Sequence, residues 1–200
     1  MKLSILPLLV FMGILLSSCG DLLDNIGNKP ENLDLNEDFQ KVEVADEFSI
    51  LVPKYMSQDS SIHPDAILSY QNNFRNAVTL VFAEYRSVVE EVVNESPTYS
   101  DSLSLAGNYL NLKGMMMSEN LEFAELGDPV YLNINGNPAA QVWLEGRVEG
   151  LDLTYFLTAI EGKSKVYFIL SFTSIEKKSK FEDTFQKIGG SFMLKSPVVD

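Results

Sequence analysis

His63 and its neighbours carry the side chains best suited to acid–base chemistry in this sequence. His63 is the only histidine, and Ser60, Ser61 and Asp65 lie within three residues of it. A serine nucleophile, a histidine base and an orienting carboxylate catalyse acyl transfer when their side chains converge in space. Residues this close together on a predicted loop before Pro64 rarely converge, and no G-x-S-x-G motif is present. We therefore predict that the protein is not an enzyme, with a His63-dependent hydrolase as a remote alternative.

Metal binding is the second kind of chemistry that the residue types allow. One histidine and one cysteine exclude the usual zinc sites. The carboxylates that could offer oxygens to calcium are Glu37, Asp38, Glu90, Glu91 and Glu95. They lack the spacing of an EF-hand, so we expect them to be solvated. Met115, Met116 and Met117 carry thioethers, the soft ligands of copper(I), but consecutive helical residues point in different directions. We expect these methionines to fill the core, and we expect no cofactor.

The first 18 residues have the order of a secretory signal peptide. Lys2 supplies a positive charge, residues 3–16 are almost all apolar, and Ser17 and Ser18 are small. The apolar run is shorter than the roughly 18 or more residues of a membrane-spanning helix. Pro7 and Gly13 also interrupt it. We therefore expect residues 1–18 to be removed, and a single-pass membrane anchor is the less favoured alternative.

Leu16-Ser17-Ser18-Cys19 resembles the lipobox of bacterial lipoproteins. The resemblance implies that the Cys19 thiol takes a diacylglyceryl group and that its new amine is acylated, for example with palmitate. One acyl chain binds a membrane marginally, whereas two or three chains hold stably. Cys19 is the only cysteine, so no intrachain disulfide competes for it. We expect a cell-envelope protein attached to the inner or outer membrane, with the outer or periplasm-facing location favoured. An ordinary cysteine beside an ordinary cleavage site is the alternative.

The chain after Cys19 divides into a polar segment and one domain. The net charge of the full sequence, −13, argues against a nucleic-acid partner, because such binding relies on Lys and Arg meeting phosphates. Residues 19–40 are rich in Asp, Asn and Glu and predict a flexible tether with an r.m.s. span of about 25 Å. The residues of this segment that are candidates for packing on the domain are Leu33, Leu35 and Phe39. We expect a globular domain at 41–195 and a C-terminal tail at 196–200.

Alternating apolar residues predict strands of an antiparallel sheet. The predicted strands are residues 42–44, 47–52, 66–71, 76–86, 151–160 and 165–173. The dipeptides that predict tight turns between strands are Asn135-Gly136, Glu149-Gly150 and Glu161-Gly162. Apolar residues three and four apart predict a helix over 98–118, with Ser100 as its cap. A second helix is predicted from Ser179, with a capping box to Glu182. Its apolar stripe consists of Phe181, Phe185 and Ile188.

The order of these elements resembles the PsbP-like superfamily. The matching segments read FSILVP, ILSYQN, NAVTLVFAEYR, QVWLEGRVEG, LDLTYFLTAI, KVYFILSFTS and KFEDTFQKIGGSF. The superfamily includes the photosystem subunit PsbP, the Ran-binding protein Mog1 and the bacterial lipoprotein DcrB. The resemblance implies an α+β fold in which helices cover both faces of an antiparallel sheet, an α/β/α sandwich. It implies no single activity, because a fold does not carry a function.

We expect the domain to be a non-catalytic module that binds an unidentified envelope protein or supports an assembly. A small-molecule or lipid-binding module is the alternative, suggested by the aromatic residues and methionines near the first helix. Lys177, Lys178 and Lys180 form a basic cluster that either stays solvated or contacts acidic partners or headgroups. Asp101-Ser102-Leu103 resembles the O-glycosylation motif of exported Bacteroidota proteins, which implies a glycan on Ser102.

A Cys19→Ala substitution should abolish acyl labelling of the protein and its release from the signal peptide by the lipoprotein route, because the thiol is the acceptor of the lipid. Metabolic labelling with a fatty acid and mass spectrometry of the N-terminal peptide check this expectation. An unmodified Cys19 in the native protein would contradict it.

Overall fold

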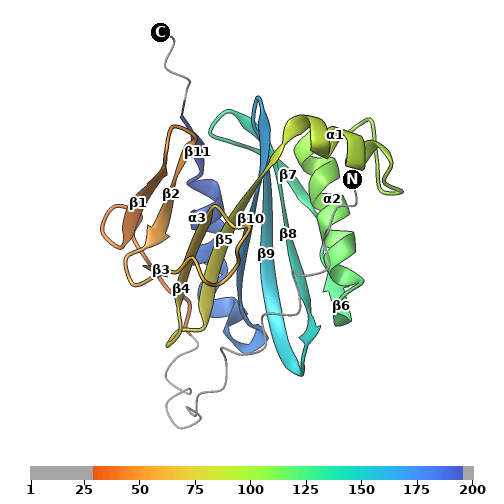
Figure 1. Ribbon diagram of the computed structural model, residues 1–200. Coiled ribbons are helices and arrows are strands. Elements are labelled where there is room, and N and C mark those ends of the chain that lie inside the picture. Colours follow the sequence, from red (N-terminus) through yellow and green to blue (C-terminus); the bar gives the residue numbers. More distant parts are fainter. Residues whose placement is uncertain (1–28, 196–200) are drawn as a thin grey trace.

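The computed structural model describes residues 29–195. The predicted signal peptide, Cys19, the first part of the predicted tether and the tail at 196–200 lie outside the described residues. Within the described range the chain forms two β-sheets and three α-helices (Figure 1). No helix in this range is both long and apolar enough to cross a membrane.

The strands of the large sheet are β3 (Ser57–Gln58), β4 (Leu68–Asn72), β5 (Ala77–Tyr85), β6 (Glu122–Leu126), β7 (Val130–Ile134), β8 (Asn137–Val148), β9 (Leu151–Glu161) and β10 (Lys165–Ser174). The small sheet consists of β1 (Phe39–Val44), β2 (Phe48–Pro53) and β11 (Met193–Leu194). The helices are α1 (Arg86–Asn94), α2 (Leu105–Ser118) and α3 (Lys178–Gly190).

The large sheet is antiparallel and has helices on both faces. Its strand order is β3-β4-β5-β10-β9-β8-β6, and β7 pairs with β8 beside β6. Helices α1 and α2 cover one face, while α3 and the small sheet cover the other (Figure 1). This arrangement confirms the predicted α+β sandwich.

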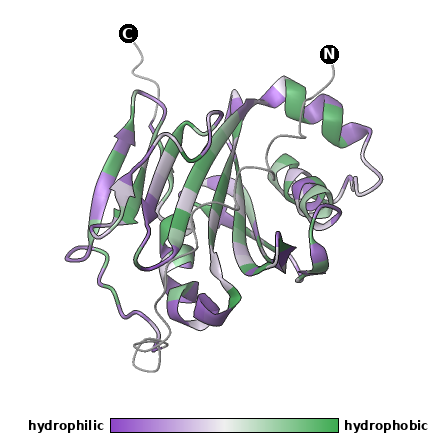
Figure 2. Ribbon diagram, turned by 60° about the horizontal axis from the view of Figure 1, so that its bottom comes forward, coloured by the Kyte–Doolittle hydropathy of each residue, from purple (hydrophilic) through white to green (hydrophobic). Residues whose placement is uncertain are grey.

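Two apolar cores follow from the alternation of side chains along the central strands. On β9, Tyr155 and Leu157 face helices α1 and α2 and belong to the first core. Phe156 and Ile160 face α3 and belong to the second core. Successive residues of a strand point to opposite faces, so one strand supplies both cores. Figure 2 shows hydrophobic residues along the central strands and hydrophilic residues on the outer turns of the helices. The predicted stripe of α3 is confirmed, since Phe181, Phe185 and Ile188 are each at most 1 % exposed.

Two of the three predicted tight turns are confirmed, whereas at Glu161-Gly162 the first residue ends β9 and the turn to β10 runs from 162 to 165. Asn135 and Gly136 join β7 to β8 with φ angles of 49° and 87°. Glu149 and Gly150 join β8 to β9 with φ angles of 50° and 80°. Two consecutive positive φ angles match the right-handed twist of a hairpin, and Asn and Gly tolerate them best.

The first predicted helix starts later than expected. Helix α2 begins at Leu105 and is capped by Ser104, whose hydroxyl accepts from the Gly107 amide at 3.1 Å. The predicted cap, Ser100, lies in the preceding turn, where the Asn108 side chain accepts from its amide and donates to its carbonyl. These two bonds satisfy the backbone N–H and C=O groups of Ser100 without helical geometry. The predicted helix start at residue 98 is therefore wrong.

Helix α1 was not predicted, because its β-branched sequence RSVVEEVVN extends the strand pattern of β5. It buries Val89 and Val93 at helical spacing, and Arg86 pairs with Glu90 one turn later at 2.7 Å. The predicted capping box of α3 is wrong as well. That helix follows a 3₁₀ turn, its N-cap is Lys177 without a side-chain cap, and Ser179 and Glu182 lie inside it.

The predicted flexible tether is wrong for residues 29–40. Phe39 opens strand β1 and is 4 % exposed, and Leu33 packs against the second core, although Leu35 is exposed. The Glu31 side chain is 6 % exposed and pairs with Arg75. The polar composition of this segment gave no sign that Glu31 would be buried. Because Glu31, Leu33 and Phe39 pack on the domain, the globular unit begins before residue 41.

Helix α3 rests on the sheet through Gly189. A Cβ atom at this position would lie 2.8 Å from Thr158 Oγ1 and 3.0 Å from Gln141 Nε2. Gly189→Ala should therefore lower the free energy of unfolding by about 1–3 kcal/mol, the usual penalty of overpacking. Gly190→Ala is the matched control, because nothing lies within 4 Å of its added Cβ. Denaturant unfolding curves check both variants, and equal stabilities would contradict the close contact.

Candidate functional site

The residues around His63 do not converge into a catalytic group. His63 Nδ1 accepts from the backbone amide of Asp65 at 3.2 Å, and the ring meets the Phe82 ring edge-on at 5.1 Å. Burial lowers the pKa of His63 below its usual value. The Ser61 hydroxyl donates to Asp59 at 2.6 Å rather than to the imidazole. The arrangement shapes a loop and offers no nucleophile activated by His63.

The methionines of α2 pack in the first core. Met117 is 6 % exposed, and Met115 and Met116 are partly buried against the same core. Among residues 29–195 no group of three or more His, Cys, Asp or Glu side chains is placed to hold a metal ion. The candidate carboxylates for calcium, Glu37, Asp38, Glu90, Glu91 and Glu95, are therefore not brought together into a metal site within this range.

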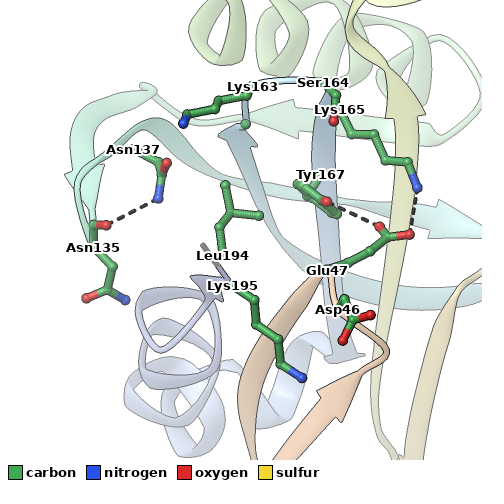
Figure 3. A pocket seen from close by; sticks show the side chains of 11 residues that line it. Asp46, Glu47, Asn135, Asn137, Lys163, Ser164, Lys165, Tyr167, Leu194 and Lys195 are labelled. Atoms are coloured by element: carbon green, nitrogen blue, oxygen red, sulfur yellow. Dashed lines mark hydrogen bonds and ion pairs between the residues drawn. The ribbon is translucent and has the colours of Figure 1, made fainter. Parts of the chain in front are cut away.

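A polar cavity of about 520 Å³ opens at one end of the large sheet (Figure 3). Three turns form its walls together with β11, namely those between β1 and β2, between β7 and β8, and between β9 and β10. Its lining residues are Asp46, Glu47, Asn135, Asn137, Gly162, Lys163, Ser164, Lys165, Tyr167, Leu194 and Lys195. Local sequence patterns cannot reveal a site assembled from turns so far apart.

Glu47 organises one wall of this cavity. Its carboxylate accepts from Lys165 Nζ at 2.7 Å and from the Tyr167 hydroxyl at 3.2 Å (Figure 3). Burial, together with the negative charge of Glu47, raises the pKa of Tyr167 to about 12. Tyr167 is therefore a neutral donor near pH 7 and does not act as a base.

The opposite wall carries Lys163, which forms no ion pair with any residue of the described range. Figure 3 shows Lys163 on one side of the cavity and Asp46 and Glu47 on the other. Charges of both signs suit a small polar molecule. Most of its lining residues are charged or polar, unlike the mostly apolar pocket expected of a lipid-binding module.

The second candidate surface is the sheet edge formed by β6 and β7, which we call the β6–β7 edge. Both strands pair with β8 along one side, and no described strand pairs with their other side. Phe123 is 77 % exposed and Val130 60 % exposed at this edge. Large apolar side chains on an open edge are unusual, because such an edge invites pairing with another chain.

Helix α2 holds the β6–β7 edge through two glycines. A Cβ atom at Gly107 would lie 3.1 Å from the Tyr131 ring, and one at Gly114 would lie 3.2 Å from Leu126. A Cβ atom at either position would be a tight contact, so the Tyr131 ring or the Leu126 side chain would have to shift by a few tenths of an ångström. The two glycines therefore allow the close approach of helix and edge.

The β6–β7 edge is also acidic. Glu122, Glu125 and Asp128 are exposed and form no ion pair within residues 29–195. A β-bulge between Glu122 and Glu125 and the segment 127–129 interrupt the pairing with β8. The short, interrupted strands explain why alternation in the sequence did not reveal this edge.

Two smaller predictions have a place in the structure. Ser102 lies in an exposed turn before α2, and its hydroxyl lies 2.8 Å from that of Ser100. Its glycosylation stays a prediction. In the basic cluster, Lys178 is engaged within the fold, since its Nζ lies 2.6 Å from Glu145 and 5.0 Å from the centre of the Trp143 ring. Lys177 and Lys180 form no ion pair in the described range.

Comparisons with known proteins find likeness at the level of structure. No protein-family model and no curated protein matches the sequence. Cyanobacterial PsbP (CyanoP) from Synechocystis sp. PCC 6803 is similar with a TM-score of 0.54 and 13 % identity, over 90 % of this chain and 98 % of that chain. A variant of the protein Mog1 is similar with a TM-score of 0.55 and 9 % identity, over 80 % of this chain and 97 % of that chain.

A third similar structure is LpqN of Mycobacterium tuberculosis, described as involved in cell envelope biogenesis. Its TM-score is 0.51 at 14 % identity, over 79 % of this chain and 91 % of that chain. Identities this low show a shared fold and nothing finer. The chain therefore has the PsbP-like fold that its order of elements predicts.

The buried Tyr167 hydroxyl makes stability depend on pH in the alkaline range. The pKa of Tyr167 is about 12 in the fold against about 10 for an exposed tyrosine, so the unfolded chain loses this proton first. The free energy of unfolding of the wild type should be constant with respect to this group below about pH 10 and should fall as the pH rises to about 12. Tyr167→Phe should show a smaller fall between pH 9 and 11.5. Identical pH dependences would contradict the placement of Tyr167.

Proposed function

We propose that the protein is a lipoprotein of the bacterial cell envelope, anchored by lipid on Cys19, whose domain binds another protein without catalysis. The observation that carries this proposal is the open β6–β7 edge with its exposed apolar side chains. The likeness to LpqN, a protein of cell envelope biogenesis, supports an envelope role. The lipobox resemblance of residues 16–19 supports the anchor.

The β6–β7 edge suits an extended segment of a partner. An edge strand leaves a row of backbone N–H and C=O groups without partners, and a peptide in extended conformation pairs with such a row. Phe123 and Val130 offer apolar contacts beside that row. Main-chain bonds would supply the affinity, and these two side chains would supply the specificity.

The charges at the β6–β7 edge favour a basic partner over a second copy. Two copies paired through β6 would bring Glu122 and Glu125 against carboxylates of the same sign, which is destabilising for directly opposed residues. A partner segment with Lys or Arg at alternate positions would instead pair with them. The proposed partner is therefore an extended, basic and partly apolar segment of an envelope protein.

The polar cavity favours a second candidate function, the binding of a small charged molecule. Lys163 on one wall and Asp46 on the other suit a ligand that carries both signs of charge. This function does not exclude the first, because the cavity and the β6–β7 edge are formed by different residues.

A photo-crosslinking amino acid at position 124, in the exposed middle of β6, tests the proposed function in intact cells. We expect a discrete crosslinked product whose partner peptide is basic. The double substitution Glu122→Lys and Glu125→Lys should reduce its yield by about tenfold or more, because two attractive contacts become repulsive. Glu91→Lys with Glu95→Lys, two exposed acids at α1, is the matched control and should leave the yield unchanged. Equal loss in both double variants, or an acidic partner peptide, would contradict the proposal.

A further inference from the structure

Five charged side chains line the polar cavity, and three of them are already paired within the protein. Lys165 Nζ donates to Glu47 at 2.7 Å. Lys195 Nζ donates to Glu43 at 3.1 Å and to the carbonyl of Ala45 at 2.6 Å. These contacts hold the turn between β1 and β2 against β10 and β11. They leave two charges of the cavity that the fold does not use.

The two remaining charges are those of Lys163 and Asp46. Like Lys163, Asp46 forms no ion pair with any residue that the structure describes. The two residues lie on opposite sides of the cavity, with Leu194 and Tyr167 between them (Figure 3). A free cation and a free anion that line one cavity suit a ligand with an anionic group at one end and a cationic group at the other.

The turn that carries Lys163 is held by Arg86 at the start of α1. The amide of Arg86 donates to the carbonyl of Ser164 at 2.9 Å. Its guanidinium donates to the Glu161 carboxylate at 2.7 Å and to the carbonyl of Gly162 at 3.3 Å. Both charged walls of the cavity are thus fixed by contacts within the fold. A site that is ordered before a ligand arrives loses little conformational entropy on binding.

The size of the cavity sets the distance between the two charges of such a ligand. A sphere of about 520 Å³ is about 10 Å across, the length of about three residues of extended chain at roughly 3.3–3.6 Å each. A single amino acid is too short to reach both walls, because its ammonium and carboxylate groups are attached to the same carbon. A tripeptide with free ends carries the two charges at the separation that the cavity requires.

Two asparagines of the cavity wall suit the amide groups of a peptide. The side-chain nitrogen of Asn135 donates to the carbonyl of Phe192 at 2.7 Å, and that of Asn137 donates to the carbonyl of Asn135 at 3.2 Å. These bonds orient both side chains and leave their Oδ1 atoms without a donor among residues 29–195. Backbone N–H groups of a bound peptide would supply such donors.

We propose that the polar cavity binds a short peptide of about three residues whose two ends are free, with its carboxylate at Lys163 and its ammonium at Asp46. This proposal rests on the second candidate function, the binding of a small charged molecule, and it names the class of that molecule. Recognition depends on the length of the peptide and on its charged ends. The β6–β7 edge takes no part in it.

An NMR titration of the full-length protein, purified from the cells that produce it, tests this proposal with trialanine as the probe. The backbone amide signals of Asp46 and Lys163 should shift in a saturable manner. Three further probes each lack one required feature: alanine lacks the length, N-acetyl-trialanine the ammonium and trialanine amide the carboxylate. Each should bind at least about fivefold more weakly than trialanine, because a hydrogen bond to a charged group is lost.

Two substitutions test which end of the peptide lies at which wall. Lys163→Gln should weaken binding of trialanine by about fivefold or more and should not weaken binding of trialanine amide, which has no carboxylate. Asp46→Asn should weaken binding of trialanine to a similar extent and should not weaken binding of N-acetyl-trialanine. Lys177→Gln and Asp65→Asn, the same changes outside the cavity, are the matched controls and should bind trialanine as the wild type does. Circular dichroism checks that every variant is folded.

The outcomes separate this proposal from the function on which it rests. Weaker trialanine binding in Lys163→Gln and Asp46→Asn, but not in the two controls, supports the peptide and its orientation. Saturable shifts that alanine or either blocked peptide produces as readily as trialanine overturn the peptide and leave a small charged ligand standing. If no probe produces a saturable shift, both the peptide and the second candidate function are overturned, whereas the crosslink from position 124 is unaffected.

Discussion

The burial of the Glu31 carboxylate is the constraint on which the arrangement of the whole protein depends. A carboxylate that is 6 % exposed has lost most of its water and must find donors within the protein. Glu31 finds them on three elements that are distant in the sequence, at Tyr55 after β2, Arg75 before β5 and Thr184 in α3. The Arg75 guanidinium also lies 4.0 Å from the centre of the Tyr55 ring, which adds a cation–π contact. One side chain thus joins the incoming chain to the sheet and to the helix that covers it.

The central strands supply the platform to which this contact attaches. Because β9 and β10 are buried on both faces, the α1–α2 layer and the α3 layer are held by the same two strands. What remains for function lies around this platform. The β6–β7 edge and the polar cavity are formed by different residues, so a partner segment and a small molecule need not compete.

The features that the sequence predicts well are those encoded by neighbouring residues. Alternation along β9 and β10, the positive φ angles at Asn135-Gly136 and the stripe of α3 each depend on a few adjacent positions. The incorrect predictions lie where tertiary contacts determine the local structure. Helix α1 has a β-branched sequence and becomes helical by burying Val89 and Val93, and the start of α2 is displaced by the contact between Asn108 and Ser100.

The candidate sites were less predictable than the fold, for a physical reason. The cavity is assembled from turns between different strand pairs, and the acidic residues near Glu31 gave no sign of the donors that bury it. Phe74 and Phe123 are exposed because no other part of the described chain covers them. A local sequence pattern cannot predict this. The lipobox resemblance at Cys19, by contrast, needs only four consecutive residues, and it lies outside the described range.

The most direct test of the account is hydrogen exchange at the backbone amide of Glu31, measured by NMR with single-residue resolution. This amide donates to the carbonyl of Lys180, and the buried carboxylate holds it there. We expect its exchange to be slowed by several orders of magnitude relative to an unstructured peptide and to become fast in Glu31→Ala. Exchange of the wild-type amide at the unstructured rate would show that the chain does not join the fold at Glu31.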